Sequence, residues 1–156
     1  MHLTDEIRIE ASVSVVFAAL NNPEILRACI PGCEELKKYS ETELAAKVLL
    51  RIGPVKARFG GTVTLDTTGA PHRVSLTGSG NGGIAGFAKG GADVELSSDG
   101  EATVLKYEAK AEIGGKIAQL GGRLVYNTAQ KLSRQFFANF KVSAENGTDA
   151  IENLLY

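Results

Sequence analysis

Tryptophan is absent from this sequence, and histidine, cysteine and methionine are scarce, with 2 histidines, 2 cysteines and 1 methionine among 156 residues. His2 lies at the terminus and His72 lies beside Pro71 in a predicted turn, so neither is placed to anchor a Ser-His-Asp triad or a metal cluster. Most acidic residues fall on predicted outward strand faces or in turns, where charges are ordinarily solvated. The composition therefore favours a binding protein over an enzyme, with no catalytic residue assigned.

The two cysteines, Cys29 and Cys33, are separated by Pro31 and Gly32, which break a helix between them. Two thiols supply only half of a structural zinc site, so no metal site is predicted. A reversible disulfide is one alternative, but in a reducing cytoplasm small buried cysteines more often pack near a tight turn. We favour packing, and we expect the Pro-Gly corner to shape the mouth of any cavity nearby.

Long apolar runs are also missing, and no stretch approaches the roughly 20 residues that span a bilayer. Asp5, Glu6 and Glu10 stand where a signal peptide would be basic and then apolar. A net charge of -1 and a pI near 6.1 give no whole-molecule reason to expect nucleic acid. We expect a cytoplasmic protein with one ligand-binding domain over residues 1–145 and a short C-terminal tail over 146–156.

Glycine, by contrast, is concentrated in residues 77–91, which hold seven of the 18 glycines. Gly78, Gly80 and Gly83 satisfy the G-x-G-x-x-G pattern, but the dinucleotide-binding form of that pattern requires a helix directly afterwards. Here a strand-like alternation follows instead. Because glycine within strands marks bends, bulges and close approaches, the segment predicts a curved sheet around a ligand or another element.

Alternating apolar and polar residues predict seven strands. They cover residues 3–11, 33–39, 44–52, 55–65, 74–78, 88–96 and 103–113. Two short helices are expected after the first strand, the second capped by Asn22 with Pro23 at its first position. Helical spacing of apolar residues then predicts one long helix over 116–142. This order is that of an α+β helix-grip fold, in which a seven-stranded curved antiparallel sheet wraps around a long C-terminal helix.

Small inward residues, Ala57, Gly61, Ala88 and Gly90, predict an apolar cavity between the sheet and this helix. Candidate ligand-binding residues follow from the phase of the strands and the helix, with the glycine-rich segment placed at the mouth. They are Phe59, Val63, Tyr107, Leu120, Leu124 and Thr128, with Gly83, Gly86 and Phe87 at the mouth. We expect a bulky residue at Gly86 to weaken ligand binding more than stability, unless Gly86 has a positive φ angle.

Basic residues form two groups without intervening acids. The first, on the long helix, includes Lys116, Arg123, Arg134 and Lys141, and the second, on two neighbouring strands, comprises Lys47, Arg51, Lys56 and Arg58. Either group could meet anionic lipid headgroups or an acidic partner surface. The alternative is an ordinary solvated face, because basic residues also complement the C-terminal end of a helix dipole.

Several segments resemble the G-subunit family of carbon monoxide dehydrogenase, which belongs to the SRPBCC, or START-like, superfamily. They are Leu-Asn-Asn-Pro-Glu at 20–24, Cys-Ile-Pro-Gly-Cys-Glu at 29–34, Ile-Gly-Pro-Val-Lys at 52–56, Phe-Gly-Gly at 59–61, Ala-Gly-Phe-Ala-Lys-Gly at 85–90 and Gly-Gly-Lys-Ile-Ala-Gln-Leu-Gly at 114–121. The resemblance covers residues 1–142. Many relatives carry a long C-terminal extension, whereas this sequence stops at Tyr156.

The resemblance implies a non-catalytic accessory protein of a carbon monoxide dehydrogenase-like molybdenum hydroxylase. It implies a hydrophobic ligand, a quinone or another isoprenoid lipid, rather than a covalent cofactor, and a place beside the inner face of the cell membrane. Two alternatives remain open from the residues. The domain could be a docking module whose cavity is filled by its own side chains, or a polyketide cyclase-like enzyme, which would need an acid or base facing inward.

Overall fold

The computed structural model describes residues 1–146 of the chain. The elements in chain order are β1 (His2–Ile9), α1 (Val13–Leu20), α2 (Pro23–Cys29), β2 (Cys33–Lys38), β3 (Glu43–Ile52), β4 (Val55–Asp66), β5 (Arg73–Asn81), the 3-10 turn η1 (Gly83–Ala85), β6 (Phe87–Asp99), β7 (Ala102–Gly114), the 3-10 turn η2 (Lys116–Leu120) and α3 (Gly122–Asn146). The predicted strands and short helices are all present.

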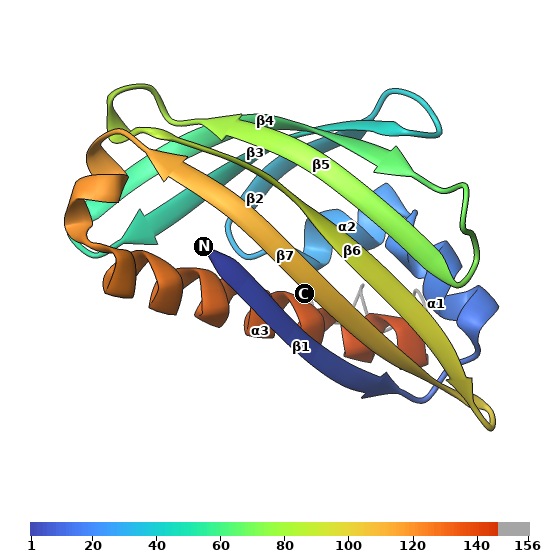
Figure 1. The fold of residues 1–156 in the computed structure, drawn as a ribbon. Coiled ribbons are helices and arrows are strands. Elements are labelled where there is room, and N and C mark those ends of the chain that lie inside the picture. Colours follow the sequence, from blue (N-terminus) through green and yellow to red (C-terminus); the bar gives the residue numbers. More distant parts are fainter. Residues whose placement is uncertain (147–156) are drawn as a thin grey trace.

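The strands form one antiparallel sheet in the order β1-β7-β6-β5-β4-β3-β2. The sheet curves around α3, and α1 and α2 cover one end of the same inner face (Figure 1). Each strand has one wet face, and the apolar stripe of α3 covers part of the other. The predicted helix-grip fold is therefore confirmed.

The predicted single helix over 116–142 is wrong at its start. A 3-10 turn occupies Lys116–Leu120, and α3 begins at Gly122 and continues to Asn146. Gly121 separates the two because its φ of 99° is a left-handed conformation that only glycine adopts readily. The apolar spacing continues across this break, so periodicity could not reveal it. The predicted tail begins with the last residue of α3, and residues 147–156 lie outside the described part.

The two short helices begin at side-chain caps. Ser12 accepts a hydrogen bond from the backbone nitrogen of Val15 at 3.4 Å and starts α1. Asn22 accepts one from the backbone nitrogen of Glu24 at 3.0 Å, with Pro23 at the first helical position, as predicted. These caps fix the residues at which α1 and α2 begin, and the two helices cover one end of the sheet. No helix within residues 1–146 is both long and apolar enough to cross a membrane.

The best-packed part of the core lies beneath α1 and α2. Phe140 of α3 is fully buried, as are Ile9 of β1 and Leu105 of β7. The ring of Phe136 stacks on Phe140 with centroids 5.9 Å apart. Cys29 belongs to the same cluster and is fully buried. Its predicted packing role is confirmed, and burial raises the pKa of its thiol despite a contact with Ser143.

Candidate functional site

An apolar cavity of ≈ 600 Å³ lies between the inner face of the sheet and α3. Its sheet side includes Val48 and Leu50 of β3, Phe59 and Val63 of β4 and Leu76 of β5. Its helix side is formed by residues spaced along one stripe of α3, namely Val125, Thr128, Ala129, Leu132, Ser133, Phe136 and Phe137. The predicted cavity is thus present, and its volume is in the range of pockets that hold small molecules.

Small side chains leave this space open. Inward positions of the sheet around the cavity carry Ala46, Gly61, Gly78, Ala88, Gly90, Ala92, Ala109 and Ala111. At Gly61 and Gly90 the neighbouring strands also come so close that a Cβ would collide with a carbonyl oxygen, of Ser79 and Lys110 respectively. The glycines therefore allow close strand approach and, at the same time, remove bulk from the inner face.

The cavity is poor in polar groups. The Thr128 hydroxyl donates to the carbonyl oxygen of Leu124 at 2.8 Å, which leaves little donor capacity for a ligand. Ser133 carries the other hydroxyl on the helix side. Tyr107, a neighbour of Ser133, stacks on Phe137 with ring centroids 4.6 Å apart. Burial raises the pKa of Tyr107, and a hydrogen bond with Ser133 opposes that rise. No histidine, aspartate or glutamate lines the cavity within residues 1–146.

The predicted ligand-binding residues divide into three groups. Phe59, Val63 and Thr128 line the cavity. Tyr107 lies next to it, through its stacking on the cavity-lining Phe137. Leu120 and Leu124 belong to the partly exposed end of the molecule, where Leu124 packs near Gly53 in the turn between β3 and β4. Ligand binding by any of them stays a prediction.

Gly83, Gly86 and Phe87, which were predicted at the cavity mouth, do not line the cavity. Phe87 lies on the outer face of the sheet, its ring over Gly114 of the paired strand, and is 44% exposed. Gly86 is buried with a φ of 120°, and a Cβ there would collide with the carbonyl oxygen of Gly114. The positive φ angle that the alternative required is therefore present, and a side chain at Gly86 is expected to destabilise the fold.

Sequence reasoning missed several lining residues on the strands, in η2 and on α3. Ile113, Ile117 and Phe136 all contribute to the cavity. The alternation in β7 already placed Ile113 inward, and helical spacing placed Phe136 on the apolar stripe. Pro31 of the Pro-Gly corner also lines the cavity, whereas the role of this corner in shaping the mouth stays a prediction. Periodicity identified the inner face, but it could not show which stretch of that face is hollow.

Several of the predicted basic residues are engaged in ion pairs. Arg58 contacts Glu34 at 2.9 Å, and Lys47 lies 3.7 Å from Glu35. Lys141 contacts Glu145 at 2.7 Å. Others form no ion pair within residues 1–146, and these are Arg51, Lys56, Lys116, Arg123 and Arg134. The two predicted groups thus contain both paired and free cations.

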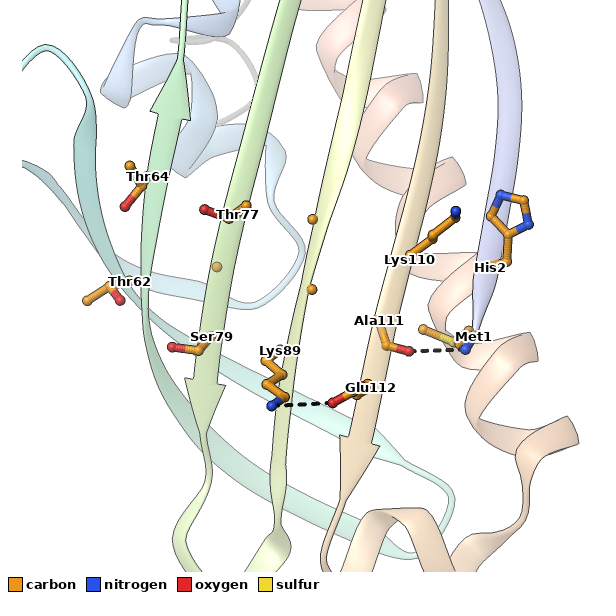
Figure 2. A pocket seen from close by; sticks show the side chains of 13 residues that line it. Met1, His2, Thr62, Thr64, Thr77, Ser79, Lys89, Lys110, Ala111 and Glu112 are labelled. Carbon is orange, nitrogen blue, oxygen red and sulfur yellow. Dashed lines mark hydrogen bonds and ion pairs between the residues drawn. The ribbon is translucent and has the colours of Figure 1, made fainter.

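A second hollow, of ≈ 890 Å³, lies on the opposite, outer face of the sheet. Figure 2 shows its threonine, serine and lysine side chains spread over neighbouring strands, with Lys89 paired to Glu112. The Lys89 and Glu112 side chains are 3.4 Å apart, and the amino terminus of Met1 donates to the carbonyl oxygen of Ala111 at 3.0 Å. These polar groups bond to one another rather than converge on a shared point, so the inner cavity is the better site.

A curved antiparallel sheet wrapped around a C-terminal helix, with an apolar cavity between them, defines the helix-grip, or START-like, class of proteins. Within that class, the model of the CoxG family, the G subunit of carbon monoxide dehydrogenase, matches residues 6–145, and the chain belongs to this family. None of the curated proteins matches the chain.

Solved structures agree with this class. A conserved protein from Geobacillus kaustophilus is 28% identical with a TM-score of 0.85, covering 92% of this chain and 95% of that one. A START superfamily protein from Mycobacterium smegmatis is 12% identical with a TM-score of 0.71, covering 92% and 97%. The Zhui aromatase/cyclase from Streptomyces sp. R1128 is 13% identical with a TM-score of 0.66, covering 93% of each chain. The last two share only the fold.

Proposed function

We propose that this protein binds a hydrophobic ligand, a quinone or another isoprenoid lipid, in the cavity between the sheet and α3. The observation that carries the proposal is a cavity of ≈ 600 Å³ lined mainly by aliphatic and aromatic side chains and by glycines. Interiors normally pack without large voids, so an apolar space of this size is best explained by a ligand that fills it. An isoprenoid chain matches the lining because it needs no hydrogen-bond partner along its length.

The lining also accommodates the head of a quinone, although less specifically. A quinone carries two carbonyl oxygens that accept hydrogen bonds, and the hydroxyl of Ser133, which is also a hydrogen-bond partner of Tyr107, is a polar group in a mainly apolar wall. When bound, a quinone would supply the capacity to accept electrons. The side chains of this cavity would exclude water from the quinone and hold its position, and Phe136 and Phe137 would add aromatic contacts.

In the cell, the protein acts as an accessory protein of a carbon monoxide dehydrogenase-like molybdenum hydroxylase, and helps either its recruitment to the membrane or electron transfer to quinone. Membership of the CoxG family supports this partner. The exposed basic side chains of α3, such as Lys131 and Arg134, offer a surface for an acidic face of the enzyme. Reversal of Lys131 and Arg134 to glutamate should then abolish co-purification with the hydroxylase, and unchanged co-purification would argue against this surface.

The two alternative functions are supported less well. A docking module whose own side chains fill the cavity does not account for the open space beside Ala46 and Ala88. A cyclase-like enzyme needs an acid or base that faces the substrate. Within the part of the chain that the structure describes, the lining has no carboxyl or imidazole group, and the lysines at its border, Lys89 and Lys110, are paired with glutamates on the outer face. The cyclase neighbour therefore supports the fold and not its reaction.

Extraction of the purified protein with organic solvent, followed by mass spectrometry, tests the ligand directly. We expect a quinone or isoprenoid lipid in the extract in about equimolar amount. In Ala129→Phe, a ring enters the cavity from α3 and should displace the ligand. In Ala138→Phe, the same change on the exposed face of the same helix should leave the ligand in place. An extract without lipid, or equal lipid content in both variants, would contradict the proposal.

A further inference from the structure

One end of the molecule combines an exposed apolar tip with unpaired cations. Ile84 in η1, at the tip of the β5–β6 hairpin, is 93% exposed. A single exposed apolar side chain is common on protein surfaces, so Ile84 gains meaning only from the groups that lie around it. Because Gly83 and Gly86 on either side have positive φ angles, the backbone presents Ile84 outward in a defined conformation.

Other elements meet at the same end. Gly86 lies against Gly115 and Ile117, and this contact brings η1 next to η2. A Cβ at Gly53 would contact the side chain of Leu124, so the β3–β4 turn lies next to the start of α3. In Figure 1 the β3–β4 turn, the β5–β6 hairpin and the start of α3 lie together at the left. Leu124 is itself 36% exposed, so this end carries a second accessible apolar side chain.

Basic residues surround these apolar side chains. Arg51 and Lys56 face each other across the β3–β4 hairpin, and Lys116 and Arg123 belong to η2 and the first turn of α3. All four are exposed, and none forms an ion pair within residues 1–146. Residues 44–65, 67–92 and 113–144, which contain the whole of this end, include no aspartate or glutamate.

The cavity reaches this end. The cavity-lining residues Ile52, Ile117 and Val125 are each followed or preceded in the chain by a residue of this end, namely Gly53, Lys116 and Leu124 respectively. We propose that this apolar and basic end, made of Ile84, Leu124, Arg51, Lys56, Lys116 and Arg123, docks on an anionic lipid bilayer, with Ile84 inserted among the acyl chains and the cavity held next to the membrane. The proposal rests on the proposed function and names the surface from which the cavity takes its ligand.

The chemistry favours a lipid surface over an acidic protein. A bilayer offers anionic headgroups over an apolar layer, which is the order in which cations and then a protruding aliphatic side chain would meet it. Together, a partly inserted side chain and a few cations give reversible attachment that weakens as salt screens the charges. An acidic protein partner would instead require a pocket that fits Ile84.

Sedimentation of the full chain with vesicles of phosphatidylcholine, with and without phosphatidylserine, tests this docking. The wild type should bind the anionic vesicles and little of the neutral ones. Ile84→Ser should lower the partition coefficient about tenfold or more, because it removes the inserted side chain. Val15→Ser, which alters a 48% exposed residue on α1 at the other end of the molecule, is the matched control and should bind as the wild type does.

Charge reversal provides a second comparison. The pair Lys116→Glu and Arg123→Glu should abolish binding to anionic vesicles at low salt. The pair Lys106→Glu and Lys110→Glu changes net charge equally on the outer face of β7, and should have a much smaller effect. Failure of the wild type to bind anionic vesicles, or wild-type binding by the Ile84→Ser variant, would overturn the docking proposal.

The membrane-docking proposal and the ligand-binding proposal can be contradicted independently of each other. Ala129→Phe should lose the extracted ligand and still bind vesicles, whereas Ile84→Ser should lose vesicle binding and still bind a short-chain quinone added from solution. If Ile84-dependent vesicle binding is found but no lipid is extracted, the docking stands and the proposed ligand falls. If lipid is extracted but Ile84→Ser does not affect vesicle binding, the proposed ligand stands and the docking proposal is contradicted.

Discussion

The two ends of the interface between the sheet and α3 are filled very differently. Near α1 and α2, Phe140 meets Leu96 and Leu105, and each is at most 1% exposed. Towards the start of α3, Ala129 and Thr128 face Gly61 and Ala88 across a cavity of ≈ 600 Å³. The same helix and the same strands form both ends. The size of the inward side chains therefore decides where the interface between sheet and helix is a packed core and where it is a cavity.

The two ends also differ in what the backbone must do. The packed end is held by large side chains and capped short helices, which would stabilise any small α+β domain. The hollow end lacks those contacts and is closed instead by glycine-rich turns, where Gly86 lies against Gly114 and η2. Stability and ligand binding are therefore expected to depend on different residues.

The largest expected effect separates the two ends by truncation on the same helix. Phe140→Ala should lower the free energy of unfolding by about 3–5 kcal/mol, since it leaves a cavity in a packed core. Leu132→Ala should cost only about 1–2 kcal/mol, because Leu132 already faces open space and loses mainly its own transfer energy. Urea unfolding of both variants measures the difference. Equal losses would show that the hollow end is as tightly packed as the other.

A smaller effect is expected at the turn that closes the hollow end. Gly86→Ala should lower the free energy of unfolding by about 1–3 kcal/mol, because a Cβ collides with the Gly114 carbonyl and the φ angle is unfavourable. Gly83→Ala is the matched control. Its φ is also positive, but no atom lies within 4 Å of its Cβ, so the loss should be about 1 kcal/mol at most. Thermal unfolding would report both, and equal losses would remove the steric argument.

The smallest effect is a pH dependence at the packed end. Glu145 accepts hydrogen bonds from the backbone nitrogen of Glu10 and from Lys141, each at 2.7 Å. Burial raises the pKa of this carboxyl, but the two donors outweigh burial and hold it below its ordinary value of 4.5. A lowered pKa means that the contribution to stability is present above that ordinary value and is lost as pH falls through the folded-state pKa.

Comparison of the wild type with Glu145→Gln measures that contribution. We expect the wild type to be more stable by about 1 kcal/mol at neutral pH, with the difference shrinking towards zero in acid. Unfolding by urea at a series of pH values gives the free energies. A difference that stays constant from neutral to acid pH would mean that the carboxylate charge has no part in holding α3 to the end of β1.

The fold could be predicted from the sequence because its determinants are local. Alternation indicated all seven strands, and Asn22 with Pro23 marked the start of α2. The break at Gly121 was missed, since apolar spacing runs unchanged from η2 into α3 and only the backbone conformation reveals it. The inner face and the presence of a cavity were also predictable, from the small residues at inward positions.

The detailed site was less accessible to sequence reasoning. Phe59, Val63 and Thr128 line the cavity because strand and helix phase place them inward. Phe87 directly precedes the inward Ala88 in β6, so the alternation that places Ala88 inward also puts the Phe87 side chain on the outer face. Which basic residues are neutralised also depended on neighbours far along the chain, as with Arg58 and Glu34.

Isothermal titration of the lipid-free protein with a benzoquinone that carries a short isoprenoid tail, at several temperatures, tests the central claim most directly. If the hollow end is a ligand cavity, binding should saturate at about one molecule per chain with a negative heat-capacity change, because apolar surface leaves water. Ala129→Phe should abolish this binding, and Ala138→Phe should not. Absence of saturable binding to the wild type, or equal binding by both variants, would contradict the account.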